Sequence, residues 1–127
     1  MKHLLFIFLF ASLSVQAKVT LPAIYSNGMV LQRNQPIRIW GQADQKEKIQ
    51  ILFAEQKQTA KADAKGYWEV NLKALEAGGP YQLQITGKDN QISIKDILIG
   101  DVWLCSGQSN MQWVVNNVTN AEVEKKN

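Results

Sequence analysis

Residues 81–95 read YQLQITGKDNQISIK, and apolar and polar side chains alternate along both halves of this stretch. Leu83 and Ile85 alternate with glutamine and threonine, and Ile92 and Ile94 flank a serine. Successive side chains of a β-strand point to opposite faces, so this period of two predicts two half-buried strands. The intervening GKDN is typical of a tight turn. The stretch therefore predicts an antiparallel β-hairpin with one apolar face.

The same pattern recurs in earlier segments. Glycine, proline and asparagine separate the segments, as in the turns of all-β proteins. From residue 18 to about residue 99 the chain is therefore predicted to be mainly β, a small antiparallel β-sandwich of about eighty residues, large enough to fold alone but only marginally. The apolar positions are Ile37 and Ile39, then Ile49, Ile51 and Phe53, then Trp68, Val70 and Leu72; the expected turns are Asn27-Gly28, Asn34-Gln35-Pro36, Lys65-Gly66 and Gly78-Gly79-Pro80.

Four aromatic residues on these strands allow two interpretations. Trp40, Tyr67, Trp68 and Tyr81 could form a platform for sugar rings, or they could pack in the core and on the sheet faces. Packing is the more common role of strand aromatics, so it is the default expectation. A secreted carbohydrate-binding β module without catalysis stays open as an alternative function.

The first seventeen residues have the pattern of a secretory signal peptide. A short basic start, Lys2 and His3, precedes a mostly apolar run from Leu4 to Val15, and Val15-Gln16-Ala17 ends on small residues. About a dozen apolar residues are too few to span a bilayer. We therefore expect residues 1–17 to be removed near Ala17, leaving a secreted or periplasmic protein with no membrane span.

Charge and composition exclude several classes of partner. The formal charge is +3, and without the one charge of Lys2 it is +2, with the basic residues dispersed along the chain. So small a charge does not predict nucleic-acid binding. His3 is the sole histidine and Cys105 the sole cysteine, so no metal site and no cofactor is predicted. Cys105 is expected to be a buried small hydrophobe.

The chain changes character after the last β segment, Ile97-Leu98-Ile99. Residues 100–111 read GDVWLCSGQSNM, an apolar run followed by small residues and a new amphipathic start. The pattern predicts a buried strand over 102–105, a tight turn and the start of a helix, with Ser109 at the corner. Nucleophilic serine hydrolases use such a strand–turn–helix, although their familiar elbow has a second glycine that GQSNM lacks.

Residues 100–111 closely resemble the first catalytic block of the sialate O-acetylesterases, serine esterases of the SGNH superfamily. The resemblance implies that Ser109 is the nucleophile and that its own backbone N–H is one oxyanion-hole donor. It also implies an accessory β domain at 18–99 and the first strand and turn of a flavodoxin-like α/β catalytic domain at 100–127.

The expected function is that of an exported enzyme releasing acetate from O-acetylated sialic acid or a related glycan, with an acetylxylan-type polysaccharide acetylesterase as the alternative. Serine hydrolysis also needs a base, usually a histidine held by a carboxylate. The family's Asp–His pair lies far downstream, and the mature chain has no histidine. The expectation is thus a truncated catalytic domain, inactive by itself.

Overall fold

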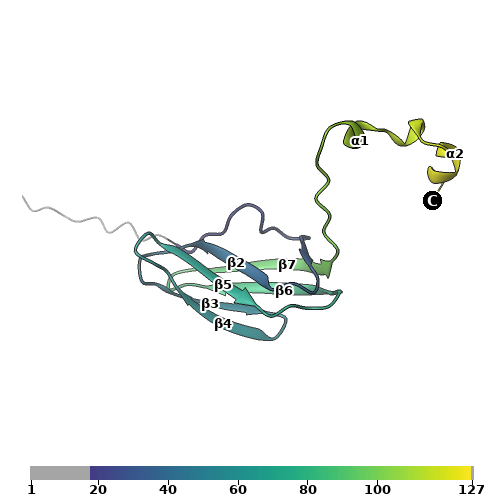
Figure 1. The fold of residues 1–127 in the computed structure, drawn as a ribbon. Helices are drawn as coiled ribbons and strands as arrows, with labels where there is room; N and C mark the ends of the chain where they lie inside the picture. Colours follow the sequence, from purple (N-terminus) through teal and green to yellow (C-terminus); the bar gives the residue numbers. More distant parts are fainter. Residues whose placement is uncertain (1–17, 127) are drawn as a thin grey trace, which may run out of the picture.

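The computed structural model describes residues 18–126, and Figure 1 shows them as a β structure followed by an extended carboxyl-terminal segment. The signal peptide predicted at 1–17 lies outside the described residues. None of the described helices is long and apolar enough to cross a membrane.

Within residues 18–126, seven strands form two sheets. One sheet has the order β1-β7-β6-β3-β4, and the other pairs β2 with β5. All pairs are antiparallel except β1 and β7, which are parallel. The prediction of a mainly β chain is confirmed, but the prediction that all strands pair antiparallel is wrong for β1 and β7. The strands are β1 (Val30–Gln32), β2 (Ile37–Gln42), β3 (Lys48–Phe53), β4 (Gln56–Lys61), β5 (Tyr67–Leu72), β6 (Gly78–Thr86) and β7 (Gln91–Gly100).

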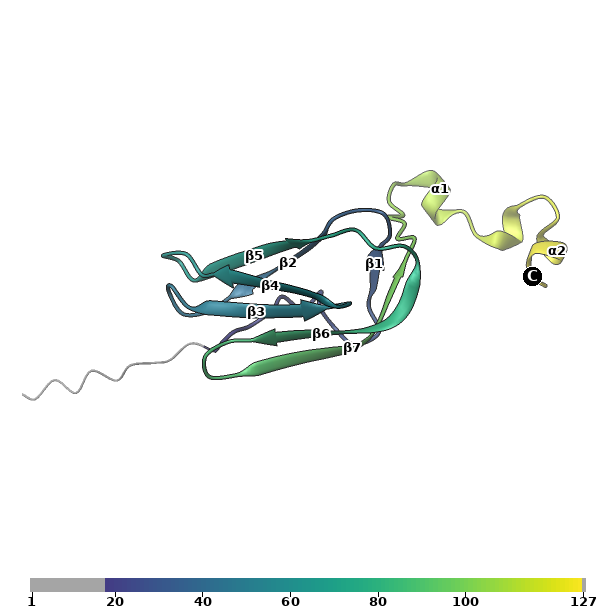
Figure 2. The ribbon, with the colours of Figure 1, turned by 90° about the horizontal axis from the view of Figure 1, so that it is seen from below.

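The two sheets enclose one hydrophobic core. In Figure 2 the larger sheet curls from β7 to β4, which brings β4 into contact with β5 of the smaller sheet. The predicted apolar faces point inward, since both sheets supply fully buried side chains to one cluster. Burial of this apolar surface is the main force that holds the sheets together. The largest fully buried residues are Trp68, Phe53, Ile39, Ile49, Ile51, Leu72, Leu83, Ile85, Ile97 and Val19.

The pattern missed two strands. β4 has the polar sequence QKQTAK, and Ala60 is its one buried residue. Its pairing with β3 through a tight turn at Ala54 and Glu55, both with positive φ, makes it a strand. β1 is only three residues long and pairs with β7 in parallel. Neither strand carries the alternation on which the prediction relied.

One predicted turn was also wrong. Gly78-Gly79-Pro80 begins β6 instead of separating two strands, and the register between β6 and β7 shifts there. Gly79 has φ +124 and lies against the backbone of β7, where a side chain would not fit. Glycine and proline thus mark an irregular strand start at this position.

The apolar run at 102–105 is not a strand in this structure. Trp103 is 83% and Leu104 94% exposed, and Cys105 is exposed as well, so the expectation that Cys105 is buried was wrong. The run has no neighbouring strand to pair with among residues 18–126. Between this run and residue 126 come three short helices: α1 (Ser109–Gln112), the 3-10 helix η1 (Val115–Asn117) and α2 (Ala121–Glu124).

Asn90 attaches the amino-terminal segment to the β6–β7 hairpin. Its side-chain amide accepts from the Val19 N–H at 3.0 Å and donates to the Val19 carbonyl at 2.9 Å. Replacing Asn90 with alanine would leave two partly buried backbone groups without partners. We expect Asn90→Ala to lower the free energy of unfolding by about 2 kcal/mol in urea denaturation.

The matched control is Asn71→Ala, because Asn71 is exposed on β5 and has no recorded side-chain hydrogen bond in the described structure. An equal loss in both variants would contradict the role assigned to Asn90.

Candidate active-site segment

Polar contacts fix the place where the segment that carries Ser109 leaves the β structure. Arg33 donates from its backbone N–H to the Gly100 carbonyl at 2.9 Å, and its guanidinium lies 2.8 Å from the Asp101 carboxylate. The Gln32 side chain accepts from the Val102 N–H at 2.8 Å. These contacts hold residues 100–102 against the end of β1 and so set the direction in which the chain departs (Figure 1).

A bend at Gln108 then precedes Ser109. Gly107 has φ +130, a backbone conformation that residues other than glycine rarely adopt. The N–H groups of Met111 and Gln112 donate to the Gln108 carbonyl at 3.2 and 3.1 Å, and this closes the helical turn of α1. The helix start predicted at this corner is therefore present, but α1 has only four residues, and the chain makes a bend at Gln108 where the tight turn was predicted.

Ser109 is the first residue of α1, and its side chain is exposed. The backbone N–H groups at the start of a helix have no acceptor within the helix, so the Ser109 N–H is free of an intrahelical partner. A serine hydroxyl and a nearby unpaired N–H are two of the groups that acyl transfer requires.

A base for Ser109 is not among its neighbours. Residues 18–126 contain no histidine, and no recorded hydrogen bond joins the Ser109 hydroxyl to another group in that range. The same range holds no cluster of three or more His, Cys, Asp or Glu side chains that could bind a metal ion. The described chain thus presents a candidate nucleophile without its proton acceptor.

The four candidate aromatics separate into two groups. Trp68 is 1% exposed in the core, and Tyr81 packs edge-on against Phe53 with ring centroids 5.7 Å apart. Packing is thus the role of these two residues, as the default expectation had it. Trp40 and Tyr67 are instead half-buried on the outer face of the β2–β5 sheet and line one surface hollow.

Sequence reasoning missed the polar residues beside this aromatic pair. Arg38 and Glu69 form an ion pair and Gln42 lines the same hollow. Each lies at an outward position of its strand, which the alternation alone does reveal. The sequence pattern does not show that these residues lie together, because β2 and β5 are separated by about thirty residues and their pairing is a tertiary contact.

The curated proteins to which this chain is similar share one name. The chain is 35% identical over 109 residues to the sialate O-acetylesterase of Mus musculus, a match covering 77% of this chain and 20% of that protein. It is 34% identical over 116 residues to the sialate O-acetylesterase of Homo sapiens, covering 80% of this chain and 22% of the human protein. The chain thus spans about a fifth of the length of these curated relatives.

A solved protein structure is also similar to this chain. The crystal structure of a carbohydrate acetylesterase from Xanthomonas citri superposes with a TM-score of 0.72 at 40% sequence identity. The match covers 84% of this chain and 24% of that one. No protein-family model matches the chain.

Proposed function

Because this chain is a homologue of the sialate O-acetylesterases, we propose that it is part of an acetylesterase that acts on O-acetylated sialic acid or a related glycan. The observation that carries the proposal is the 34–35% identity to proteins of that name, since it extends over 77–80% of the chain. The Ser109 corner supplies groups that suit this chemistry.

In the proposed mechanism the Ser109 hydroxyl attacks the acetyl carbonyl carbon. A histidine takes the hydroxyl proton, and the Ser109 N–H stabilises the negative charge that develops on the carbonyl oxygen. The C–O bond to the sugar then breaks, and the histidine returns its proton to the departing sugar oxygen. Water, deprotonated by the same histidine, hydrolyses the acetyl-serine and releases acetate.

The histidine and its aspartate would come from a part of a longer protein outside these 127 residues. We propose that 100–127 begins an SGNH-type catalytic domain of flavodoxin-like fold and that 18–99 is an accessory β domain. The exposure of Val102, Trp103 and Leu104 supports this arrangement, because three consecutive large apolar residues in water favour burial against further polypeptide. Residues 1–17 would direct export to the periplasm or the exterior.

A second substrate class has its own support. The relative of known structure is named a carbohydrate acetylesterase, and it shares 40% identity with this chain. That name covers acetylated carbohydrates in general, so we keep an acetylated polysaccharide such as acetylxylan as the alternative substrate for the same Ser109 chemistry.

The test is acetate release by the longer protein from two substrates, an O-acetylated sialic acid and acetylated xylan. Faster release from sialic acid supports the first proposal, and faster release from xylan supports the second. Failure on both would overturn the proposed function. Residues 18–127 assayed alone should release no acetate from either, because this stretch lacks the histidine.

A further inference from the structure

We propose that a hollow on the outer face of the β2–β5 sheet binds a neutral sugar ring of a glycan chain. The site is separate from Ser109 and requires no catalysis, so it goes beyond the proposed esterase function. It rests on that function only in the choice of a glycan as ligand. The hollow has a volume of about 350 Å³ and is lined by Thr20, Leu21, Pro22, Trp40, Gly41, Gln42 and Tyr67.

Two aromatic side chains, together with Leu21 and Pro22, form the apolar part of the hollow. Gln42 pairs with Tyr67 and Trp40 with Glu69 across the antiparallel strands, so Trp40 and Tyr67 are diagonal neighbours on one face. The C–H groups on one side of a pyranose ring form an apolar surface that packs against an aromatic ring. A volume of this size is at the lower end of small-ligand sites, which combine apolar walls with a few polar groups.

The lining is uncharged, which favours a neutral ligand. All seven lining residues are neutral, and the Gln42 amide and the Thr20 hydroxyl are groups that hydrogen-bond sugar hydroxyls. The charged side chains that contact this lining are Arg38 and Glu69, which both hydrogen-bond Tyr67 and pair with each other. An anionic sugar would therefore find no unpaired cation in the lining.

The same ion pair orients the Tyr67 ring. The Tyr67 hydroxyl donates to the Glu69 carboxylate at 2.5 Å and accepts from the Arg38 guanidinium at 3.1 Å. The Tyr67 hydroxyl and then the Arg38 guanidinium, through hydrogen bonds, hold the pKa of the Glu69 carboxyl below its usual range. Exposed ion pairs add little stability, so the effect of this network is to position the ring.

Trp40 is also held in place before any ligand binds. The Arg38 guanidinium lies over its ring, 5.6 Å from the centroid, and Tyr25 packs edge-on at 5.1 Å. The Tyr25 hydroxyl donates to the Arg38 carbonyl at 3.0 Å, and burial raises the pKa of Tyr25 to about 12, so this donor keeps its proton at neutral pH. A side chain ordered in advance loses less entropy on binding.

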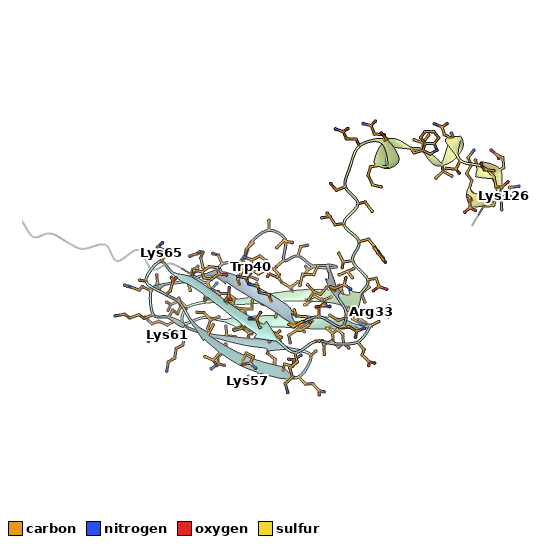
Figure 3. All side chains as sticks on the ribbon, in the orientation of Figure 1. Arg33, Trp40, Lys57, Lys61, Lys65 and Lys126 are labelled. Atoms are coloured by element: carbon orange, nitrogen blue, oxygen red, sulfur yellow. The ribbon has the colours of Figure 1, made fainter. Side chains whose placement is uncertain are left out.

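The hollow is also clear of the segment that carries Ser109. Gln42 and Tyr67 pair at one end of the β2–β5 sheet, whereas Ile37 and Leu72 pair at the other. Figure 3 shows Trp40 between Lys65 and Arg33, and Arg33 contacts Asp101 where the carboxyl-terminal segment departs. A glycan in the hollow would therefore not compete with residues 101–126 for space.

The experiment is a titration of residues 18–127, labelled with nitrogen-15, with xylohexaose as the neutral probe and 3′-sialyllactose as the anionic one. The expected result is a saturable shift of the Trp40 indole N–H signal with xylohexaose and a weaker shift with sialyllactose. Trp40→Ala should weaken binding by about tenfold or more, as expected when an aromatic anchor is removed. Absence of saturable binding to xylohexaose would overturn the proposal.

Three further variants separate the possible explanations. Gln42→Ala should weaken binding several-fold with the fold intact, because Gln42 is exposed, and this covers the case in which Trp40→Ala unfolds the protein. Trp113→Ala, which removes a tryptophan that is 62% exposed outside the hollow, should bind normally. Ser109→Ala should also bind normally, so failure of the esterase function would leave the glycan site standing.

The competing occupant of this face is another part of a longer protein. Repeating the titration on that longer protein distinguishes the two. Binding in both proteins supports a glycan site, whereas binding that is lost in the longer protein would show that the face is covered there and would overturn the proposal.

Discussion

Ser109→Ala in the longer protein is expected to reduce acetate release by a factor on the order of 10⁵ to 10⁶, the size of effect seen when a serine hydrolase loses its nucleophile. Alanine keeps the backbone N–H but has no hydroxyl to attack the acetyl carbonyl, so oxyanion stabilisation alone remains. The fold should be unaffected, because the Ser109 side chain is exposed at the start of α1. The measurement is acetate release at saturating substrate, with thermal unfolding as the check on folding.

Ser106→Ala is the matched control for this experiment. Ser106 is exposed, and it lies three residues before Ser109 in the same block. It should keep most of the activity. Full activity in Ser109→Ala, or an equal loss in the control, would remove Ser109 from the mechanism.

Gly41→Ala is expected to destabilise the β structure by about 3 kcal/mol, the upper part of the range for overpacking a core. A Cβ at this position would lie 2.8 Å from the Trp68 ring and closer still to the Thr20 carbonyl. That carbonyl accepts from the Gln42 N–H at 3.0 Å, so relief of the clash would break this backbone bridge. The free energy of unfolding from urea titration measures the effect.

Gly100→Ala provides the comparison. At Gly100 the nearest atom to a new Cβ would be a Val30 methyl at 3.5 Å, which is an ordinary contact, and no positive φ is involved. Its stability should change by less than about 1 kcal/mol. An equally small effect of Gly41→Ala on stability would contradict the close packing assigned to Gly41.

Gly41→Ala should also weaken glycan binding, since Thr20 and Gly41 both line the hollow.

Much of the fold follows from local pattern. Ile49, Ile51 and Phe53 alternate with exposed residues, and a strand with that pattern can bury its apolar side chains only by turning one face inward. The same argument gives the inward face of β2, β5 and β6, whereas in β7 the alternation shifts by one residue at Asp96, which has a positive φ. The Ser109 corner was equally local, because Gly107 and the polar residues after it favour a turn whatever lies around them.

Tertiary structure decided the features that depend on a pairing partner and not on a strand's own pattern. β4 is a strand because β3 pairs with it, and β1 pairs in parallel with β7, which no turn between neighbours could specify. The run at 102–105 has a strand's composition but, among residues 18–126, no strand to pair with, and an unpaired strand is not stable in water.

The separation of the aromatics has the same origin. Alternation places Trp68 on the apolar face of β5 and Tyr67 on the polar face, but it does not say which side chains of another strand lie beside Tyr67. Packing of the two sheets buries Trp68 and leaves Trp40 and Tyr67 at the surface beside Arg38 and Glu69. The sequence alone therefore determined which residues share a face, because strand geometry is local. Only the tertiary structure decided which strands lie side by side, because pairing depends on elements outside each strand.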